Sequence, residues 1–149
     1  MELKMKALSP KIGAEIPVPS FATVGSAAMD LRACIDADVT IAAGQRAIIP
    51  TGIAIALPSA EYVALICARS GLASKFGITM ANGVGVIDSD YRGEISVGLY
   101  NRSTQDFTVE RGDRIAQLMF MPVYAANLIE CDELDETERG AGGFGSTGK

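Results

Sequence analysis

The feature that most restricts the fold of this 149-residue chain is a series of short apolar runs with a period of two residues. In one of them, Ile95, Val97 and Leu99 would share one face of a strand. Turn residues separate the runs, as at 50–52 and 111–113. Runs of this kind between turns predict an all-β antiparallel sandwich or barrel. The runs span residues 46–57, 62–68, 94–101, 106–110 and 114–123.

Helical periodicity is nearly absent from the sequence. The exception is SGLASKFG, residues 70–77, which is long enough for two helical turns. Ser70 would be the N-cap of this helix and Gly77 would end it. The expected fold therefore contains at most one short helix.

The sequence contains no histidine. This excludes Ser-His-Asp and Cys-His catalysis and disfavours a zinc enzyme. Proton abstraction near neutral pH must then fall to a carboxylate, a lysine or a tyrosine. The net charge of −5 argues against general nucleic-acid binding, but it is compatible with a small polyphosphate held by arginines or Mg²⁺.

Two features bear on location. No apolar run approaches the roughly 18 residues that a membrane helix needs, and residues 1–19 lack the apolar core of a signal peptide. The three cysteines form no C-x-x-C pair and are expected to be reduced thiols. The sequence therefore predicts an intracellular protein with no membrane partner, cytoplasmic or, in a eukaryote, nuclear.

The last residues, RGAGGFGSTGK at 139–149, are rich in glycine. Their G-F-G-S-T-G-K fits a phosphate-binding P-loop except for its final Ser/Thr, which would follow Lys149, and the flanking strand and helix of a P-loop are missing. The preceding stretch carries six carboxylates in ECDELDETE and is expected to be a solvated linker. We expect a folded domain over residues 1–129, followed by the linker and the glycine-rich arm over 130–149.

Four further stretches place a polar side chain among apolar neighbours. Each has an ordinary structural explanation as a turn carboxylate, a surface arginine on a capped helix or a partly exposed strand position. None of them decides the function alone. They are SAAMDLRA (26–33) with Asp30, ARSGLA (68–73) with Arg69, NGVGVIDSDYRGE (82–94) with Asp88, and RGDRIAQLMF (111–120) with Gln117.

Together with the tail, and in this order and spacing, the stretches resemble the five motifs of the homotrimeric deoxyuridine triphosphate nucleotidohydrolases, or dUTPases. Two positions depart from the family pattern: Ala28 stands where glycine is usual, and Ala68 where proline is usual. Neither change removes a chemical group. The five counterparts are AAMDL (27–31), RSGLA (69–73), GVIDSDYRGE (85–94), RGDRIAQL (111–118) and RGAGGFGSTG (139–148).

This resemblance implies a distorted jelly roll of the β-clip type, in a homotrimer whose C-terminal arms are exchanged between subunits. It implies Mg²⁺-dependent hydrolysis of dUTP to dUMP and pyrophosphate, which limits uracil incorporation into DNA and supplies the dTMP precursor. Asp88 resembles the general base that activates a water for attack on the α-phosphate. Asp30 resembles the carboxylate that supports Mg²⁺ through water. Contacts to the phosphates would come from Arg69, Ser70, Gly71 and Gln117.

The same resemblance also indicates which residues would contact the uracil base and the deoxyribose. Tyr91 would lie under the deoxyribose and leave no room for a 2′-hydroxyl. A tight hairpin would also refuse the methyl group of thymine, with a discrimination of about 1–3 kcal/mol. The residues that resemble the uracil-reading hairpin are Asn82, Val86, Ile87 and Ser96.

The resemblance makes the glycine-rich tail a mobile arm that closes over the bound nucleotide. Phe144 would stack on uracil, and Arg139 would pair with the γ-phosphate. Gly145, Ser146 and Thr147 would offer N–H and hydroxyl donors to the phosphates. The arm would reach a site on a neighbouring subunit, so that each of three sites is shared.

Two other functions remain open at this level. A dCTP deaminase would share the sandwich and the trimer, although the intact IDSDYRGE stretch and the full arm favour a dUTPase. A catalytically idle trimeric binding or regulatory protein on the same fold would bind nucleotide without turnover. The expected partners are dUTP and further copies of the chain, with no nucleic acid.

Overall fold

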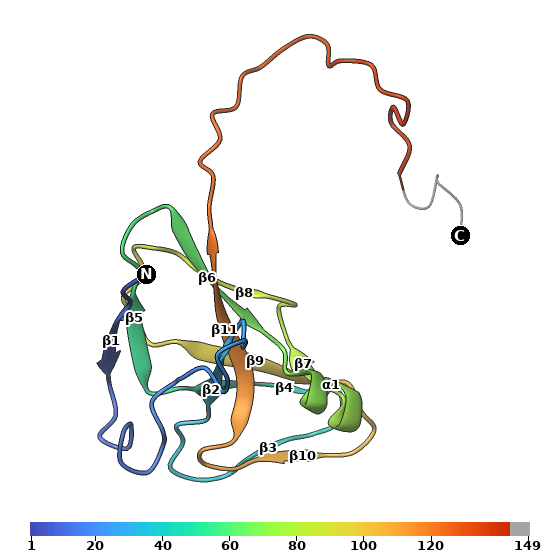
Figure 1. Ribbon diagram of the computed structural model, residues 1–149. Coiled ribbons are helices and arrows are strands. Elements are labelled where there is room, and N and C mark those ends of the chain that lie inside the picture. The colour runs from blue at the N-terminus through green and yellow to red at the C-terminus, as the bar shows by residue number, and fades with distance from the viewer. Residues whose placement is uncertain (144–149) are drawn as a thin grey trace.

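The computed structural model describes residues 1–143, which form strands and one helix (Figure 1). The prediction of an all-β fold with at most one short helix is confirmed for these residues. In chain order the elements are β1 Lys4–Ala7, β2 Met29–Arg32, β3 Val39–Ile41, β4 Arg46–Pro50, β5 Ile53–Ala56, β6 Tyr62–Cys67, α1 Ser70–Phe76, β7 Ile78–Met80, β8 Gly85–Ile87, β9 Ser96–Asn101, β10 Phe107–Val109 and β11 Arg114–Pro122.

All strand pairs in the described part of the chain are antiparallel. The largest sheet has the order β2-β11-β6-β8, a second has the order β4-β9-β7, and β1-β5 and β10-β3 form two pairs. Apolar side chains of both larger sheets join one buried cluster, so the sheets pack as a sandwich and not as a closed barrel. The cluster includes Leu31, Ala64, Ile66 and Leu118 from the first sheet and Ile49, Ile78, Val97 and Leu99 from the second.

The alternation in the run that contains β9 follows the prediction. Ile95, Val97 and Leu99 are at most 1% exposed, whereas Ser96 is exposed and Tyr100 is half-buried. Apolar side chains on one face of the strand therefore enter the core, and the other face stays accessible.

The helix α1 differs from the prediction at its start. Its N-cap is Arg69, in extended conformation with φ −83° and ψ 127° and with no side-chain capping hydrogen bond. The prediction of Ser70 as N-cap is therefore wrong by one residue, and the Ser70 hydroxyl is not used to cap α1. The predicted end is confirmed, because Gly77 is the C-cap and adopts the left-handed conformation at φ 69°.

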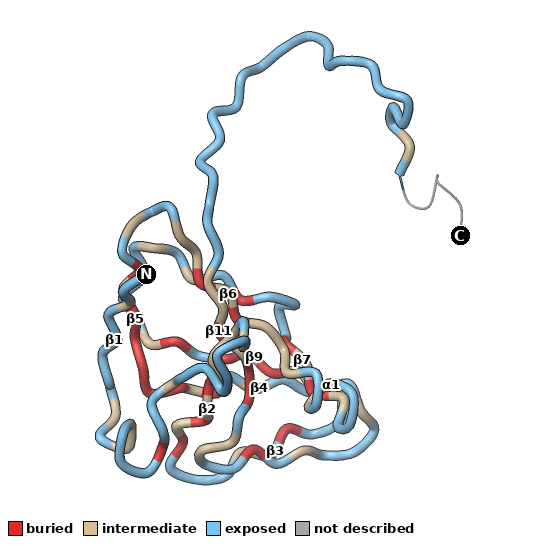
Figure 2. Tube along the Cα trace, in the orientation of Figure 1, coloured by how far each residue is buried: buried red, intermediate tan, exposed pale blue. Residues whose placement is uncertain are grey.

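The chain leaves the sandwich after β11 and continues as a long extended segment, drawn in orange and red in Figure 1. Residues 121–141 are exposed throughout, as the pale blue colour in Figure 2 shows. Tyr124, Leu128 and Ile129 are 91%, 97% and 86% exposed. Burying large apolar side chains is favourable, and among residues 1–143 this segment has no surface that buries them.

Candidate active site

Three of the stretches singled out in the sequence meet on the four-stranded sheet. Gln117 on β11 lies opposite Asp30 on β2 and, on its other side, opposite Cys67 on β6. Directly opposed residues of neighbouring strands have their side chains on the same face. Arg69 follows two residues after Cys67, at the start of α1. The sheet register therefore brings Asp30, Gln117 and Arg69 to one end of one sheet face.

Asp30 is the centre of an ion-pair group with two arginines. Arg69 Nε donates to Asp30 Oδ1 at 2.8 Å, and Arg114 Nη1 donates to Asp30 Oδ2 at 3.4 Å. Arg69 Nη1 also donates to the backbone oxygen of Arg114 at 3.3 Å. Two guanidinium groups around one carboxylate leave an excess positive charge, which suits an anionic ligand.

The ion-pair group is partly accessible to solvent. The side chains of Asp30 and Arg69 are 23% and 20% exposed, and that of Arg114 is 49% exposed. Both arginines line a cavity of about 390 Å³ whose apolar wall is formed by Leu72, Phe76, Phe107 and Ile115. The guanidinium groups therefore border open space, from which a ligand can reach them.

A β-bulge sets the direction of Arg114. The β11–β2 register shifts between Arg114 and Ala116, so that Arg114 lies opposite Arg32 instead of one position beyond it. Ile115 and Ala116 are both buried. With regular pairing of every residue, Arg114 would lie opposite the buried Ala33 and point to the core side of the sheet; the bulge puts it opposite Arg32, on the face that carries Asp30.

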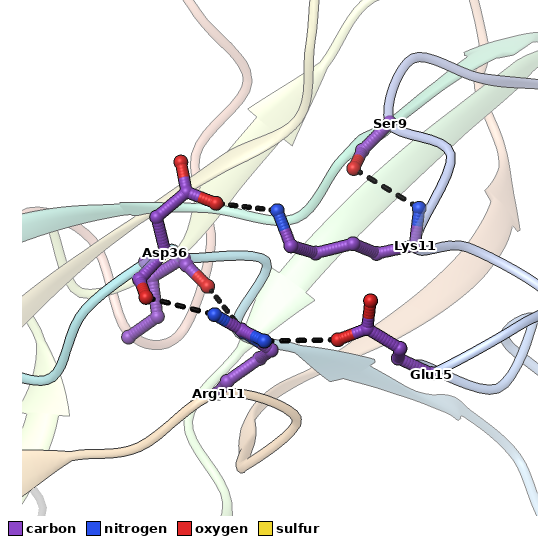
Figure 3. A network of polar contacts seen from close by, with 6 residues as sticks. Ser9, Lys11, Glu15, Asp36 and Arg111 are labelled. Carbon is purple, nitrogen blue, oxygen red and sulfur yellow. Dashed lines mark hydrogen bonds and ion pairs between the residues drawn. The ribbon is translucent and has the colours of Figure 1, made fainter.

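The turn that leads into β11, residues 110–113, is held by several hydrogen bonds. Arg32 Nη1 donates to Gly112 O at 2.7 Å. Arg111 donates from Nε to Ile35 O and from Nη2 to Asp36 O, each at 2.8 Å, and pairs with Glu15 at 2.9 Å (Figure 3). These contacts hold the backbone of the turn that precedes Arg114.

The salt bridge between Lys11 and Asp36 adds to the same network (Figure 3). Lys11 lowers the pKa of the Asp36 carboxyl group, first through the hydrogen bond and then through its charge. A carboxyl group whose pKa is lowered in the folded state stabilises the fold at pH values above its ordinary pKa. It loses this contribution as the pH falls through the lowered pKa. The Asp36 carboxyl group therefore stays ionised at neutral pH and keeps its salt bridge to Lys11.

A second group of candidate residues lies on β8 and on the segment that follows it. Asp88 comes directly after β8 and is exposed. Tyr91 N donates to Asp88 O at 3.2 Å, and Tyr91 Oη donates to Glu94 O at 3.0 Å. The backbone of Tyr91 is therefore bonded to Asp88 and its phenol group is anchored at Glu94, while 44% of the residue remains exposed.

The loop between β7 and β8 completes this second group. The hairpin expected here is not formed, because β7 pairs with β9 and β8 pairs with β6, in different sheets. Gly83 has φ 76°, a conformation that favours glycine, and Ala81 N donates to Gly98 O on β9 at 2.8 Å. Asn82 and Val86 are exposed and Ile87 is half-buried. Ser96, at the start of β9, is exposed as well. The β7–β8 loop and the start of β9 thus present accessible residues.

The two groups are far apart in one chain. If the β8–β6 register is continued by one residue, Asp88 lies opposite Val63 on β6. Val63 is four residues before Cys67, and Cys67 is level with Asp30 through Gln117. At about 3.3 Å per residue this is about 13 Å along the strands. The three strand spacings from β8 to β2 add about 14 Å across the sheet, at about 4.8 Å each. Asp88 and Asp30 are hence roughly 20 Å apart.

The described part of the arm makes no bond to either group in the same chain. Arg139 Nε donates to Gly142 O at 2.8 Å, within the arm itself. The predicted contacts of Phe144, Gly145, Ser146 and Thr147 lie outside the described residues.

The donor set is compatible with only one mode of Mg²⁺ binding. No group of three or more Cys, Asp or Glu side chains that could hold a metal occurs within residues 1–143. Asp30 is a single, partly accessible carboxylate. Mg²⁺ commonly keeps several waters and binds through one or two carboxylates and the phosphates of the substrate, and Asp30 fits that mode.

In residues 1–143, no helix has the length and apolar character of a membrane span.

Comparison with known proteins bears on the whole chain. A family model described as dUTPase matches residues 14–148. The deoxyuridine 5′-triphosphate nucleotidohydrolase of Serratia proteamaculans is 47% identical over 99% of this chain and 97% of its own. The enzyme of the same name from Desulfitobacterium hafniense is 56% identical over 88% of this chain and 87% of its own.

Among solved structures, the dUTPase of Staphylococcus bacteriophage 80alpha, as a G164S mutant with dUpNHpp, is similar with a TM-score of 0.88 and 25% identity. The match covers 99% of both chains. The shared architecture confirms the expected jelly-roll class for this fold. Sequence and fold therefore point to the same group of proteins.

Proposed function

The chain belongs to the dUTPase family and hydrolyses dUTP to dUMP, and from this premise we propose which residues carry the reaction. The observation that supports the proposal most strongly is the sheet register. It places Asp30, Gln117 and Arg69 together, and each of them comes from a different family motif.

Asp88 is the general base. Its carboxylate accepts a proton from a water molecule, and the water oxygen bonds to the α-phosphorus. The bond from that phosphorus to the bridging oxygen breaks, and pyrophosphate leaves. A carboxylate suits this role in a chain without histidine, and the exposed position after β8 gives it access to water.

Arg69, Ser70, Gly71 and Gln117 bind the phosphates and the leaving group. Arg69 brings a planar donor fork that matches phosphate oxygens. The Ser70 hydroxyl does not cap α1, and the first backbone N–H groups of a helix have no partners within the helix. Both kinds of group can therefore donate hydrogen bonds to phosphate oxygens. Asp30 would hold Mg²⁺ through water, and the ion would neutralise charge on the phosphate oxygens.

Uracil binds along the loop between β7 and β8 and along β8 itself. Asn82, Val86, Ile87 and Ser96 border it, and their accessible groups can read the polar edge of the base. Tyr91 packs under the deoxyribose, where its ring excludes a 2′-hydroxyl. The hydrogen bond to Glu94 O at 3.0 Å keeps the ring from moving aside.

The active site is shared within a homotrimer. A separation of roughly 20 Å between Asp88 and Asp30 exceeds the length of a triphosphate. One nucleotide can therefore use both groups only if they come from different subunits. The exposed apolar residues Tyr124, Leu128 and Ile129 support an arm that is exchanged onto a neighbouring subunit. We keep the division into a domain of residues 1–129 and an arm of 130–149 as part of this proposal.

The arm closes the site. Arg139 pairs with the γ-phosphate and Phe144 stacks on uracil, while Gly145, Ser146 and Thr147 donate to phosphate oxygens. Closure by such an arm excludes bulk water other than the nucleophile.

The substrate assignment is tested with a panel of nucleotides. The purified protein is incubated with Mg²⁺ and, separately, with dUTP, dCTP, TTP and UTP, and pyrophosphate and ammonia are measured. Pyrophosphate from dUTP alone is expected, because the segment that binds uracil rejects the thymine methyl and Tyr91 rejects the 2′-hydroxyl. Ammonia from dCTP would identify a deaminase, and no product from any nucleotide would leave a binding protein.

Replacement of Tyr91 by alanine tests the sugar assignment. We expect the ratio of kcat/KM for dUTP over UTP to fall by about 10- to 100-fold, because the side chain that occupies the position of the 2′-hydroxyl is removed. Tyr100→Ala is the control, since Tyr100 lies on β9 beside Arg46 and has no assigned contact with the sugar. An unchanged ratio in Tyr91→Ala would remove Tyr91 from the site.

A further inference from the structure

Arg114 belongs to the Asp30 ion-pair group but has no role in the reaction as proposed above. We propose that Arg114 is a positioning residue, which holds the Asp30 carboxylate through Oδ2 when Arg69 turns from Oδ1 to the triphosphate. The inference rests on the proposed roles of Asp30 and Arg69 and deepens them.

The need for a second partner follows from the double use of Arg69. In the structure its Nε is bound to Asp30 Oδ1 at 2.8 Å, yet the reaction requires the same guanidinium at the phosphates. A triphosphate carries more negative charge than one carboxylate and attracts the arginine more strongly. Asp30 would then face the phosphates with Oδ1 free, and without a further contact its rotamer would not be fixed.

Arg114 supplies that contact from a fixed position. Its Nη1 lies 3.4 Å from Asp30 Oδ2, the oxygen that Arg69 does not use. The bulge before Ala116 aims the side chain at this face. The turn behind it is held by Arg32 through Gly112 O and by Arg111 through the network of Figure 3. Arg114 thus keeps one carboxylate oxygen in place and leaves the other for a water on Mg²⁺.

The experiment measures binding of the analogue dUpNHpp to the full-length protein by titration calorimetry, with and without Mg²⁺. Partners that orient a metal-binding carboxylate are typically worth 10- to 100-fold in metal affinity. Arg114→Gln is therefore expected to reduce the gain in analogue affinity that Mg²⁺ gives by about 10-fold or more. Affinity without Mg²⁺ should change much less than this gain, because Arg114→Gln removes one nearby positive charge but no proposed contact with the analogue. Arg114→Lys, which keeps a charge near Oδ2, should recover part of the gain.

Two comparisons separate positioning from other roles. In an Asp30→Asn background, Arg114→Gln should have no further effect on the gain from Mg²⁺, because both changes interrupt the same interaction. Arg102→Gln removes one positive charge from the exposed loop after β9 and should leave both affinities unchanged. If Arg114→Gln and Arg114→Lys both weaken binding equally with and without Mg²⁺, Arg114 contacts phosphate directly and the inference is wrong.

The unmodified protein distinguishes failure of the inference from failure of the proposed function. If it neither binds dUpNHpp nor shows a gain from Mg²⁺, the proposed roles of Asp30 and Arg69 fail first. If it shows the gain and both Arg114 variants retain it in full, only the positioning role is refuted. Melting temperatures of all variants show whether Arg114→Gln is folded, and Arg114→Lys keeps the test decisive where it is not.

Discussion

Replacement of Asp88 by asparagine is expected to lower kcat for dUTP by about 10²- to 10⁴-fold, the contribution typical of a general base. Asparagine has nearly the same size and shape but cannot accept the proton from the attacking water. Affinity for dUpNHpp should stay close to that of the unmodified protein, because Asp88 is not assigned to binding. Turnover is measured as pyrophosphate release, and affinity by titration calorimetry.

The matched control is Asp90→Asn, which removes a carboxylate two residues further along the same exposed segment. It should retain turnover, so that loss of charge from this segment is separated from loss of the base. Equal turnover in Asp88→Asn and the unmodified protein would remove Asp88 as the base. A large loss of analogue affinity in Asp88→Asn would instead point to a binding role.

Deletion of residues 139–149 should reduce turnover by about 100-fold or more, since a single preorganised donor to a reacting phosphate or carbonyl group can already be worth that much. The deletion removes the arginine, the aromatic ring and the donors assigned to the nucleotide. The trimer should persist, because residues 123–138, which carry the exposed apolar side chains, remain. Turnover and sedimentation of the shortened protein are the measurements.

Removal of Lys149 alone is the control for this deletion, because no contact is assigned to that residue. It should keep both turnover and assembly. Full activity of the longer deletion would refute closure by the arm. Loss of the trimer in that deletion would show that residues 139–149 contribute to assembly as well as to the site.

The general course of the fold could be predicted because burial alternates along the strands. Ile95, Val97 and Leu99 enter the core as their spacing indicated. Gly77 ended the helix because its left-handed conformation suits glycine. The N-cap was misplaced because Ser70 is a good capping residue by type, yet the extended backbone of Arg69 starts the helix one residue earlier.

The candidate site was less accessible to sequence reasoning. Motif resemblance led to Asp30, Arg69 and Gln117, and the register of β2, β11 and β6 explains how distant stretches meet there. Arg114 was missed because its face depends on a bulge, and strict alternation would have pointed it to the core. The available signal was the adjacent apolar pair Ile115 and Ala116, which interrupts the period of two.

In the proposed homotrimer, the roles of individual residues would depend on how subunits meet, and neither periodicity nor spacing within one chain encodes that arrangement. Asp88 and Asp30 illustrate the point, because they lie on opposite edges of one sheet. In the proposed homotrimer, the two carboxylates at one nucleotide would come from different subunits.

That separation has a consequence for a cell in which intact and damaged copies of the chain mix. In the proposed homotrimer, each copy would supply Asp88 to one site and the Asp30 group to another. A copy lacking both groups would therefore inactivate two sites of its trimer, and with random mixing activity would fall as the square of the intact fraction. A copy that lacks only Asp88 and a copy that lacks only the Asp30 group could instead form one working site between them. The activity of a mixed trimer would therefore depend on which of the two groups each copy has lost.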